Sequence, residues 1–251
     1  MAEMALKTEY YDIPEPDISH IITEDDTPVD NIFSEKQQRL LTESISLSWK
    51  PDRPFISLAN VGIFYGINLP PIVPDVMVSL DVKYAEDVWK KKHRSYFVWE
   101  FGKPPEVVIE VVSNRKGGET DAKMRKYAQV GVWYYIILDP QQLIQKDVVR
   151  VFELSPGNYI PKLDLFLPKV NIGVKLWEGN YEGMQAQWLR WCDKDGNLMA
   201  TGKESVEQEK MKVVQERKRA VQAEKEVKKE RDRAKKLEEK LRALGIDPDE
   251  S

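Results

Sequence analysis

The sequence is poor in the residues that build disulfide frameworks and zinc sites. Its 251 residues include one cysteine, Cys192, and two histidines, His20 and His93. A lone cysteine cannot form an internal disulfide, and a structural zinc site needs about four Cys or His ligands. An internal disulfide framework and Cys/His zinc chemistry are therefore excluded.

Long apolar runs are also absent. No stretch approaches the roughly 18 apolar residues that indicate a membrane span. The first residues, MAEMALKTEYYDIPEPD, contain neither the basic region nor the apolar core of a secretory signal. We therefore expect a cytoplasmic protein with no membrane partner.

An excess of positive charge is the third absence. The formal net charge is −4, which argues against a protein that holds nucleic acid by bulk electrostatics, since phosphate contacts drive most non-specific binding. Two local basic clusters, KKKHR at 90–94 and NRKGGETDAKMRK at 114–126, run against this trend. They form either a positive patch beside the acids discussed below or ordinary solvated loop and helix faces.

The composition nevertheless supports a folded core. Apolar residues make up 41% of the chain and aromatic residues 10%, which is ordinary for a globular protein. The length suits one domain of about 150–200 residues with an appendage. We predict an irregular arm, one α/β domain, a linker, a charged helix and a tail, at 1–29, 30–195, 196–204, 205–245 and 246–251.

Turn signals and apolar periodicity predict the elements of the domain. A first helix begins with Ser34 as its N-cap, because apolar residues follow it at helical spacing. Apolar runs between glycine and proline signals predict strands. They fall at 54–71 (one or two strands), 73–82, 94–100, 104–113 and 133–140, with a hairpin over 148–160 and a tight strand or turn at 171–183; the strands within 54–82 would form a meander.

The segment PPEVVIEVVS at 104–113 is the clearest strand. Its nearly continuous apolar run is typical of a central strand buried on both faces. Thr120 or Asp121 can cap a following helix that reaches about Gln129 and closes at Gly131. A strand at 133–140 comes next, and a strand–helix–strand unit of this kind is normally parallel. The core is therefore predicted to be mixed α/β.

The C-terminal helix has no proline or glycine over 205–244 and alternates Lys, Arg and Glu densely. Counting by seven gives an unbroken apolar series, but acids occupy several of the positions three residues further on. A solvated charged helix and a short dimerising coiled coil both remain open. The series is Val206, Val213, Ala220, Val227, Ala234 and Leu241.

Two acids sit beside apolar runs. Asp75 stands in VPD before Val76, and Glu110 lies inside VVIEVV. A buried carboxylate is costly unless a cation or a hydrogen-bond partner accepts its charge. If both acids occupy neighbouring positions of one sheet, they can chelate Mg²⁺ or Mn²⁺ with the main-chain carbonyl of Val111. Alternatively, Asp75 caps a turn and Glu110 pairs with a lysine or arginine inside the sheet.

Phosphodiester hydrolysis also needs a positive group near the attacking water. Lys123 is the candidate, because it lies early on the helix after the Glu110 strand and can point back towards the carboxyl end of that strand. Lys126 is the second choice, and Arg125 is expected to face solvent.

The ordered set VPD, PPEVVIEVVSN and ExxxKMRKYAQVGVWYYIILDP resembles the bacterial Uma-type endonuclease family of the PD-(D/E)XK restriction-endonuclease-like superfamily, over roughly 30–195. The resemblance implies a mixed sheet flanked by helices, with acids that bind Mg²⁺ for DNA hydrolysis. Asp75 matches the motif aspartate and Glu110 the acid of the second motif. The motif lysine does not match, because Val112 stands two positions after Glu110; a lysine displaced to the following helix points to Lys123.

Other positions extend the resemblance. Glu119 falls where the family often has an acid, and a helical glutamate that joins the metal site in some superfamily members points to Glu35 or Glu43. The family's packing signature is matched by Tyr127, Gly131 and Val132.

Two functions follow as hypotheses. The first is a Mg²⁺-dependent DNA endonuclease, dimeric through its C-terminal helix, with Asp75, Glu110 and Lys123 as its catalytic residues. The alternative is a catalytically inactive nuclease-like domain that binds protein or nucleic acid as a scaffold through that helix. Convergence of the three side chains would favour the enzyme, because a scaffold does not require it.

Overall fold

The computed structural model describes residue 17 and residues 31–113 and 122–243. The chain divides into two compact units, Met1–Met199 and Ala200–Ser251. The predictions for Glu119, Thr120 and Asp121 lie outside the described residues, as do nearly all of the predicted N-terminal arm and the predicted tail.

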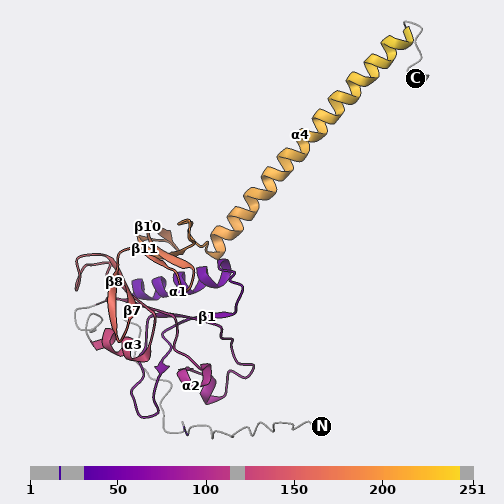
Figure 1. Cartoon of the computed structure of the whole chain (residues 1–251). Coiled ribbons are helices and arrows are strands. Elements are labelled where there is room, and N and C mark those ends of the chain that lie inside the picture. The colour runs from indigo at the N-terminus through magenta and orange to yellow at the C-terminus, as the bar shows by residue number, and fades with distance from the viewer. Residues whose placement is uncertain (1–16, 18–30, 114–121, 244–251) are drawn as a thin grey trace, which may run out of the picture. The chain divides into compact units, whose positions relative to one another are not determined.

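The first unit is built from a mixed set of helices and strands (Figure 1). In chain order these are α1 Ile32–Ser48, β1 Phe55–Ala59, β2 Ile63–Phe64, β3 Val76–Leu80, η1 Lys91–His93, β4 Tyr96–Phe97, α2 Val98–Phe101, β5 Val107–Val111, α3 Met124–Val130, β6 Tyr134–Leu138, β7 Val149–Ser155, β8 Asn158–Lys162, β9 Phe166–Leu167, β10 Ile172–Tyr181 and β11 Met184–Cys192.

The main sheet has six strands in the order β1-β3-β5-β6-β7-β8. β5 and β6 pair in parallel across the crossover through α3, whereas the other neighbours pair antiparallel. All residues of β5 and β6 are buried, as expected for central strands covered on both faces. The mixed α/β fold, the parallel crossover and the edge hairpin β7–β8 are confirmed.

Each face of this sheet packs against its own apolar cluster. On one face Leu41 and Ile45 of α1 pack with strand residues that include Ile109 and Val111. On the other face Tyr127 of α3 packs in a cluster that includes Val108. Because successive strand residues alternate between faces, the side chain of Glu110 points to the α3 side.

The first helix begins earlier than predicted. Its N-cap is Asn31, whose side-chain oxygen accepts a hydrogen bond from the main-chain nitrogen of Ser34 at 2.9 Å. The prediction of Ser34 as the N-cap is wrong, because Asn31, three positions earlier, caps the helix with its side chain. Ser34 instead lies inside the first turn and is buried.

The predicted strand over 94–100 is largely wrong. Only Tyr96–Phe97 is extended, and the chain then turns into the short helix α2, which ends at Gly102 with φ of 75°. β4 pairs in parallel with β2 in a separate two-stranded sheet, so the predicted meander does not form either. A short apolar run fits a strand and a helix turn equally well, which explains the error.

The region after 171 holds more strand than predicted. β10 and β11 form a long antiparallel hairpin through Glu182 and Gly183, in a three-stranded sheet with β9. Trp188 and Trp191 of β11 are fully buried. The indole nitrogen of Trp191 donates to the carbonyl of Leu41 at 3.0 Å. Trp191 therefore belongs to the main core.

The second unit contains α4, Gly202–Ala243, a helix of 42 residues with none buried. It begins three residues before the predicted start at 205. Thr201 and Glu204 cap each other there: the Thr201 nitrogen donates to the Glu204 carboxylate at 2.8 Å, and the Glu204 nitrogen donates to the Thr201 hydroxyl at 3.3 Å. Within the described part of the chain, no helix is both long and apolar enough to cross a membrane.

Candidate metal and catalytic site

Asp75 directly precedes β3, at the point where the pairing of β3 with β5 stops. The last paired residues are Val76 and Ile109. One step further, the Asp75 side chain takes the place of a main-chain partner: its Oδ2 accepts a hydrogen bond from the nitrogen of Val111 at 2.6 Å. The end of this pairing therefore places a carboxylate against the edge of β5.

The same contact orients Val111. Its N–H points to Asp75, and in a β-strand the N–H and C=O of one residue point to the same side. Val112 bonds instead to Leu138 of β6, at 2.8 Å. The carbonyl of Val111 is therefore directed to the side of β5 on which Asp75 lies.

Glu110 is the buried acid of the site, with a side chain 1% exposed. Its Oε2 lies 2.8 Å from Nζ of Lys123, and its Oε1 accepts a hydrogen bond from the Tyr127 hydroxyl at 2.7 Å. Burial raises the pKa of Glu110 to about 8; Lys123 opposes that rise and the nearby Asp75 adds to it. The two acids are therefore within electrostatic reach of each other.

Lys123 comes from the start of the α3 region and contacts the β5 carboxylate. It occupies the N-cap position of α3, and its side chain is partly buried. Lys126 is half-buried and Arg125 is exposed. The structure thus brings together Asp75 from the residue before β3, Glu110 from β5 and Lys123 from the start of α3.

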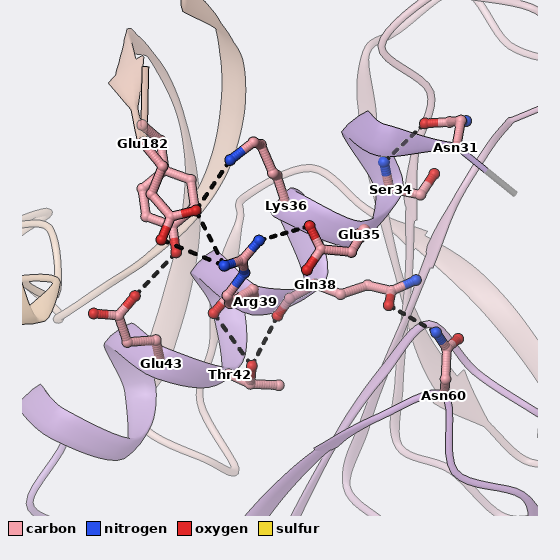
Figure 2. Close-up of polar contacts among 11 residues, drawn as sticks. Asn31, Ser34, Glu35, Lys36, Gln38, Arg39, Thr42, Glu43, Asn60 and Glu182 are labelled. Carbon is pink, nitrogen blue, oxygen red and sulfur yellow. Dashed lines mark hydrogen bonds and ion pairs between the residues drawn. The ribbon is translucent and has the colours of Figure 1, made fainter. Parts of the chain in front are cut away.

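Two further residues, Gln38 and Asn60, belong to the site and were not predicted. The side-chain nitrogen of Gln38 donates to Oδ1 of Asp75 at 2.8 Å. The side-chain oxygen of Gln38 accepts a hydrogen bond from the Asn60 side chain at 2.8 Å (Figure 2). The main-chain nitrogen of Asn60 also donates to the Asp75 carbonyl at 3.2 Å. The sequence signal for Gln38 was its helical spacing: it lies three positions before Leu41 and seven before Ile45, so it is a polar residue on the apolar face of the helix.

Glu35 and Glu43, the helical acids suggested for the metal site, are held elsewhere. Glu35 forms an ion pair with Arg39 at 2.7 Å, and Glu43 accepts a hydrogen bond from the Tyr181 hydroxyl at 2.9 Å. Figure 2 shows both acids on the side of α1 that faces Glu182. The α1 residue that reaches Asp75 is Gln38, because it lies on a different side of the helix.

The residues present fit a small divalent cation. Two carboxylates and one carbonyl are hard oxygen donors of the kind that Mg²⁺ accepts, and Mg²⁺ keeps several waters of its own. Each Asp75 oxygen accepts one of the hydrogen bonds above. Burial raises the pKa of Glu110, and a bound cation would favour the ionised carboxylate, because an opposite charge lowers the pKa of an acid. Within 31–113 and 122–243 no cluster of three or more acidic, His or Cys ligands occurs.

Comparison with known proteins bears on these residues. Residues 8–170 match the model of a family described as "Uma2: Putative restriction endonuclease". Among solved structures, a crystal structure described as a putative nuclease belonging to DUF820, from Anabaena variabilis, is 16% identical with a TM-score of 0.38. The match covers 56% of this chain and 74% of that one. No curated protein matches this chain.

Proposed function

The chain belongs to the Uma2 family of restriction-endonuclease-like proteins, and from this premise we propose that it is a Mg²⁺-dependent DNA endonuclease that hydrolyses phosphodiester bonds. One observation carries the proposal: the carboxylate of Asp75, just before β3, bonds the nitrogen of Val111, which follows Glu110 in β5, and Lys123 bonds the buried carboxylate of Glu110. A scaffold has no need of a buried acid beside a second acid.

Asp75, Glu110 and the carbonyl of Val111 would hold the metal ion, Mg²⁺ or Mn²⁺. When bound, such an ion supplies a water of lowered pKa and offsets the charge that develops on the phosphate. The protein's part is to hold the donors in place. Gln38 and the nitrogen of Val111 each bond one oxygen of Asp75, so this carboxylate has little freedom to rotate.

Lys123 and Tyr127 fix the other carboxylate and shape its charge. The Tyr127 hydroxyl bonds Oε1 of Glu110, and the Lys123 ammonium bonds Oε2. The lysine also places one positive charge where a phosphate oxygen or the attacking water would approach, which stabilises developing negative charge. Lys123 thereby takes the role that the superfamily motif gives to a lysine two positions after the acid.

A binding role through α4 is the second candidate function. The helix is exposed along its whole described length, including large apolar side chains such as Val213, Val227 and Leu237. This observation fits a helix that pairs with a partner. The partner that we propose is a second copy of the chain, which would bring two sites to one DNA duplex.

Cleavage of supercoiled plasmid tests the enzyme proposal. Wild type should nick the plasmid with Mg²⁺ or Mn²⁺ and not with EDTA. Glu110→Ala and Lys123→Ala should each lose this activity at retained fold. Lys126→Ala, which removes a lysine from the same helix, is the matched control and should keep it. No cleavage by wild type with either metal, on supercoiled, linear or single-stranded DNA, would contradict the proposal and favour the scaffold.

A further inference from the structure

The segment between β3 and β4 presents a tryptophan to solvent. Trp89 is 78% exposed, and its neighbours Tyr84 and Val88 are 62% and 48% exposed. Tryptophan is usually well buried, and clustered exposed apolar side chains mark binding surfaces. The proposed hydrolysis uses none of these residues.

Local contacts hold this segment in shape. The Asp87 carboxylate accepts a hydrogen bond from the main-chain nitrogen of Trp89 at 3.0 Å, and the His93 ring contacts the Asp87 carbonyl at 2.5 Å. Nε of Arg94 donates to the carbonyl of Trp89 at 3.0 Å. The exposure of Trp89 is therefore imposed by an organised turn around η1.

A cavity of about 220 Å³ lies beside this turn. It is smaller than the roughly 300–1,000 Å³ of sites for drug-sized ligands, which suits a single planar ring system. Its lining joins apolar side chains to charged ones and includes Leu58, Val61, Tyr84, the cations Lys83 and Arg94, and the acid Glu100.

The charge of the segment is opposite to that of the chain. Residues 83–95 carry five Lys or Arg and two acids, Glu86 and Asp87, whereas the whole chain has a net charge of −4. Lys92 lies 3.6 Å from Glu100, while Lys83 and Lys90 are exposed. Aromatic faces beside exposed cations are how proteins hold unpaired nucleotides, because bases stack and phosphates pair with the cations.

The cavity and the candidate metal site share one short stretch of the chain around Asn60. Leu58 and Val61 line the cavity and flank Asn60 in the chain. Asn60 bonds both the carbonyl of Asp75 and the side chain of Gln38. The segment 58–61 therefore contributes to both the cavity and the candidate site.

We propose that the Trp89 surface, formed by Trp89, Tyr84, Lys83, Lys90 and the adjoining cavity, binds an unpaired stretch of a DNA strand. A base stacks on the aromatic side chains, and phosphates pair with the two lysines. The inference rests on the proposed function and names its substrate form: DNA that exposes single-stranded nucleotides near the bond to be cut.

Binding of a fluorescein-labelled oligo(dT) strand, measured by anisotropy in EDTA so that nothing is cleaved, tests this assignment. Trp89→Ala should weaken binding about 10-fold, and Trp89→Phe should restore most of it, because base stacking on an aromatic ring carries that difference. Lys83→Ala with Lys90→Ala should lower the slope of log K against log salt by about 1.4, from two lost single-strand phosphate contacts.

The matched control removes two exposed lysines, Lys228 and Lys229, from α4, and should leave the salt slope unchanged. The inference would be overturned if Trp89→Ala bound the oligo(dT) strand with wild-type affinity, or if the α4 control lowered the salt slope as much as the Lys83 and Lys90 variant. It would also be overturned if a labelled duplex of the same length bound as tightly as the single strand. Because the assay needs no metal, binding without plasmid cleavage would contradict the enzyme proposal alone. If wild type cleaves the plasmid and Trp89→Ala binds oligo(dT) as tightly as wild type, the result would contradict this inference alone.

Discussion

At the scale of single residues, Glu110 links the site to stability. Its pKa is raised from 4.5 to about 8 in the folded protein, and burial is the largest cause. Between these values the folded protein holds a proton that the unfolded chain has released, so stability falls as pH rises from about 4.5 to 8. Burial of the ionised acid without metal costs on the order of several kcal/mol at the upper end.

Urea unfolding in EDTA across pH 4.5–8 measures this effect. Wild type should lose stability steadily over the range, and Glu110→Gln should show a flatter profile, because glutamine keeps the shape and does not titrate. Equal slopes for the two proteins would show that another group is responsible.

Gln38 is the residue that the structure adds to the site. Gln38→Ala removes the hydrogen bond to Oδ1 of Asp75 and the acceptor of the Asn60 amide. We expect a stability loss of about 1–3 kcal/mol together with a cleavage rate at least about 10-fold lower, as for loss of a residue that orients a metal ligand.

Gln37 is the matched control for Gln38. It is the preceding residue and is equally polar and buried, but its side chain bonds the main chain of Leu189 at 2.8 and 2.9 Å. Gln37→Ala should cost comparable stability and leave the cleavage rate of the folded protein near wild type. Equal rate losses in both variants would assign the effect of Gln38 to folding and not to Asp75.

At the scale of elements, the central unit β5–α3–β6 could be predicted because its strands are buried on both faces. Strands buried on both faces have nearly continuous apolar sequences, such as VVIEVV, and clear turn signals lie on either side of them. Elements set by tertiary context could not be read this way. β11 belongs to the three-stranded sheet and mixes polar with apolar residues, without a continuous apolar run. α2 is a single turn in a run that also fits a strand.

The helix N-cap of α1 can be tested directly. Asn31→Ala should destabilise the protein by about 1 kcal/mol, because the Ser34 nitrogen loses its acceptor. Ser34→Ala should be near neutral or stabilising, since the buried Ser34 hydroxyl has no hydrogen-bond partner among the described residues. Thermal unfolding of the two variants measures both effects. A larger loss of stability in Ser34→Ala than in Asn31→Ala would show that Ser34 is the N-cap.

The candidate site shows the same division between motif and context. Asp75, Glu110 and Lys123 carried sequence signals, since acids beside apolar runs need partners. Gln38 reaches Asp75 only through the packing of α1 beside β1 and β3. Asn60 reaches it where the pairing of β1 with β3 continues past Ala59 and Val76. A glutamine within a helix has no motif of its own, so the role of Gln38 could not be predicted from the sequence. The suggestion of Glu35 or Glu43 came from the right helix and the wrong side of it.

At the scale of the whole molecule, α4 sets the expected assembly. Val213 belongs to the seven-residue apolar series, whereas the adjacent Val214 does not. If the series pairs two copies, sedimentation equilibrium should give a dimer. Val213→Glu with Val227→Glu should shift that dimer to monomer, because buried like charges oppose pairing. Val214→Glu with Val221→Glu is the control and should remain dimeric. A monomeric wild type at tens of micromolar would contradict the proposed pairing.

The central claim is that Asp75 and Glu110 form one divalent-cation site, and Mn²⁺ binding followed by electron paramagnetic resonance tests it most directly. Wild type should bind one Mn²⁺ per chain, displaceable by Mg²⁺. Asp75→Asn and Glu110→Gln should each lose it, and Glu35→Gln should retain it, since Glu35 is paired with Arg39. Stoichiometric Mn²⁺ binding that survives in both Asp75→Asn and Glu110→Gln, or no binding by folded wild type, would contradict the account.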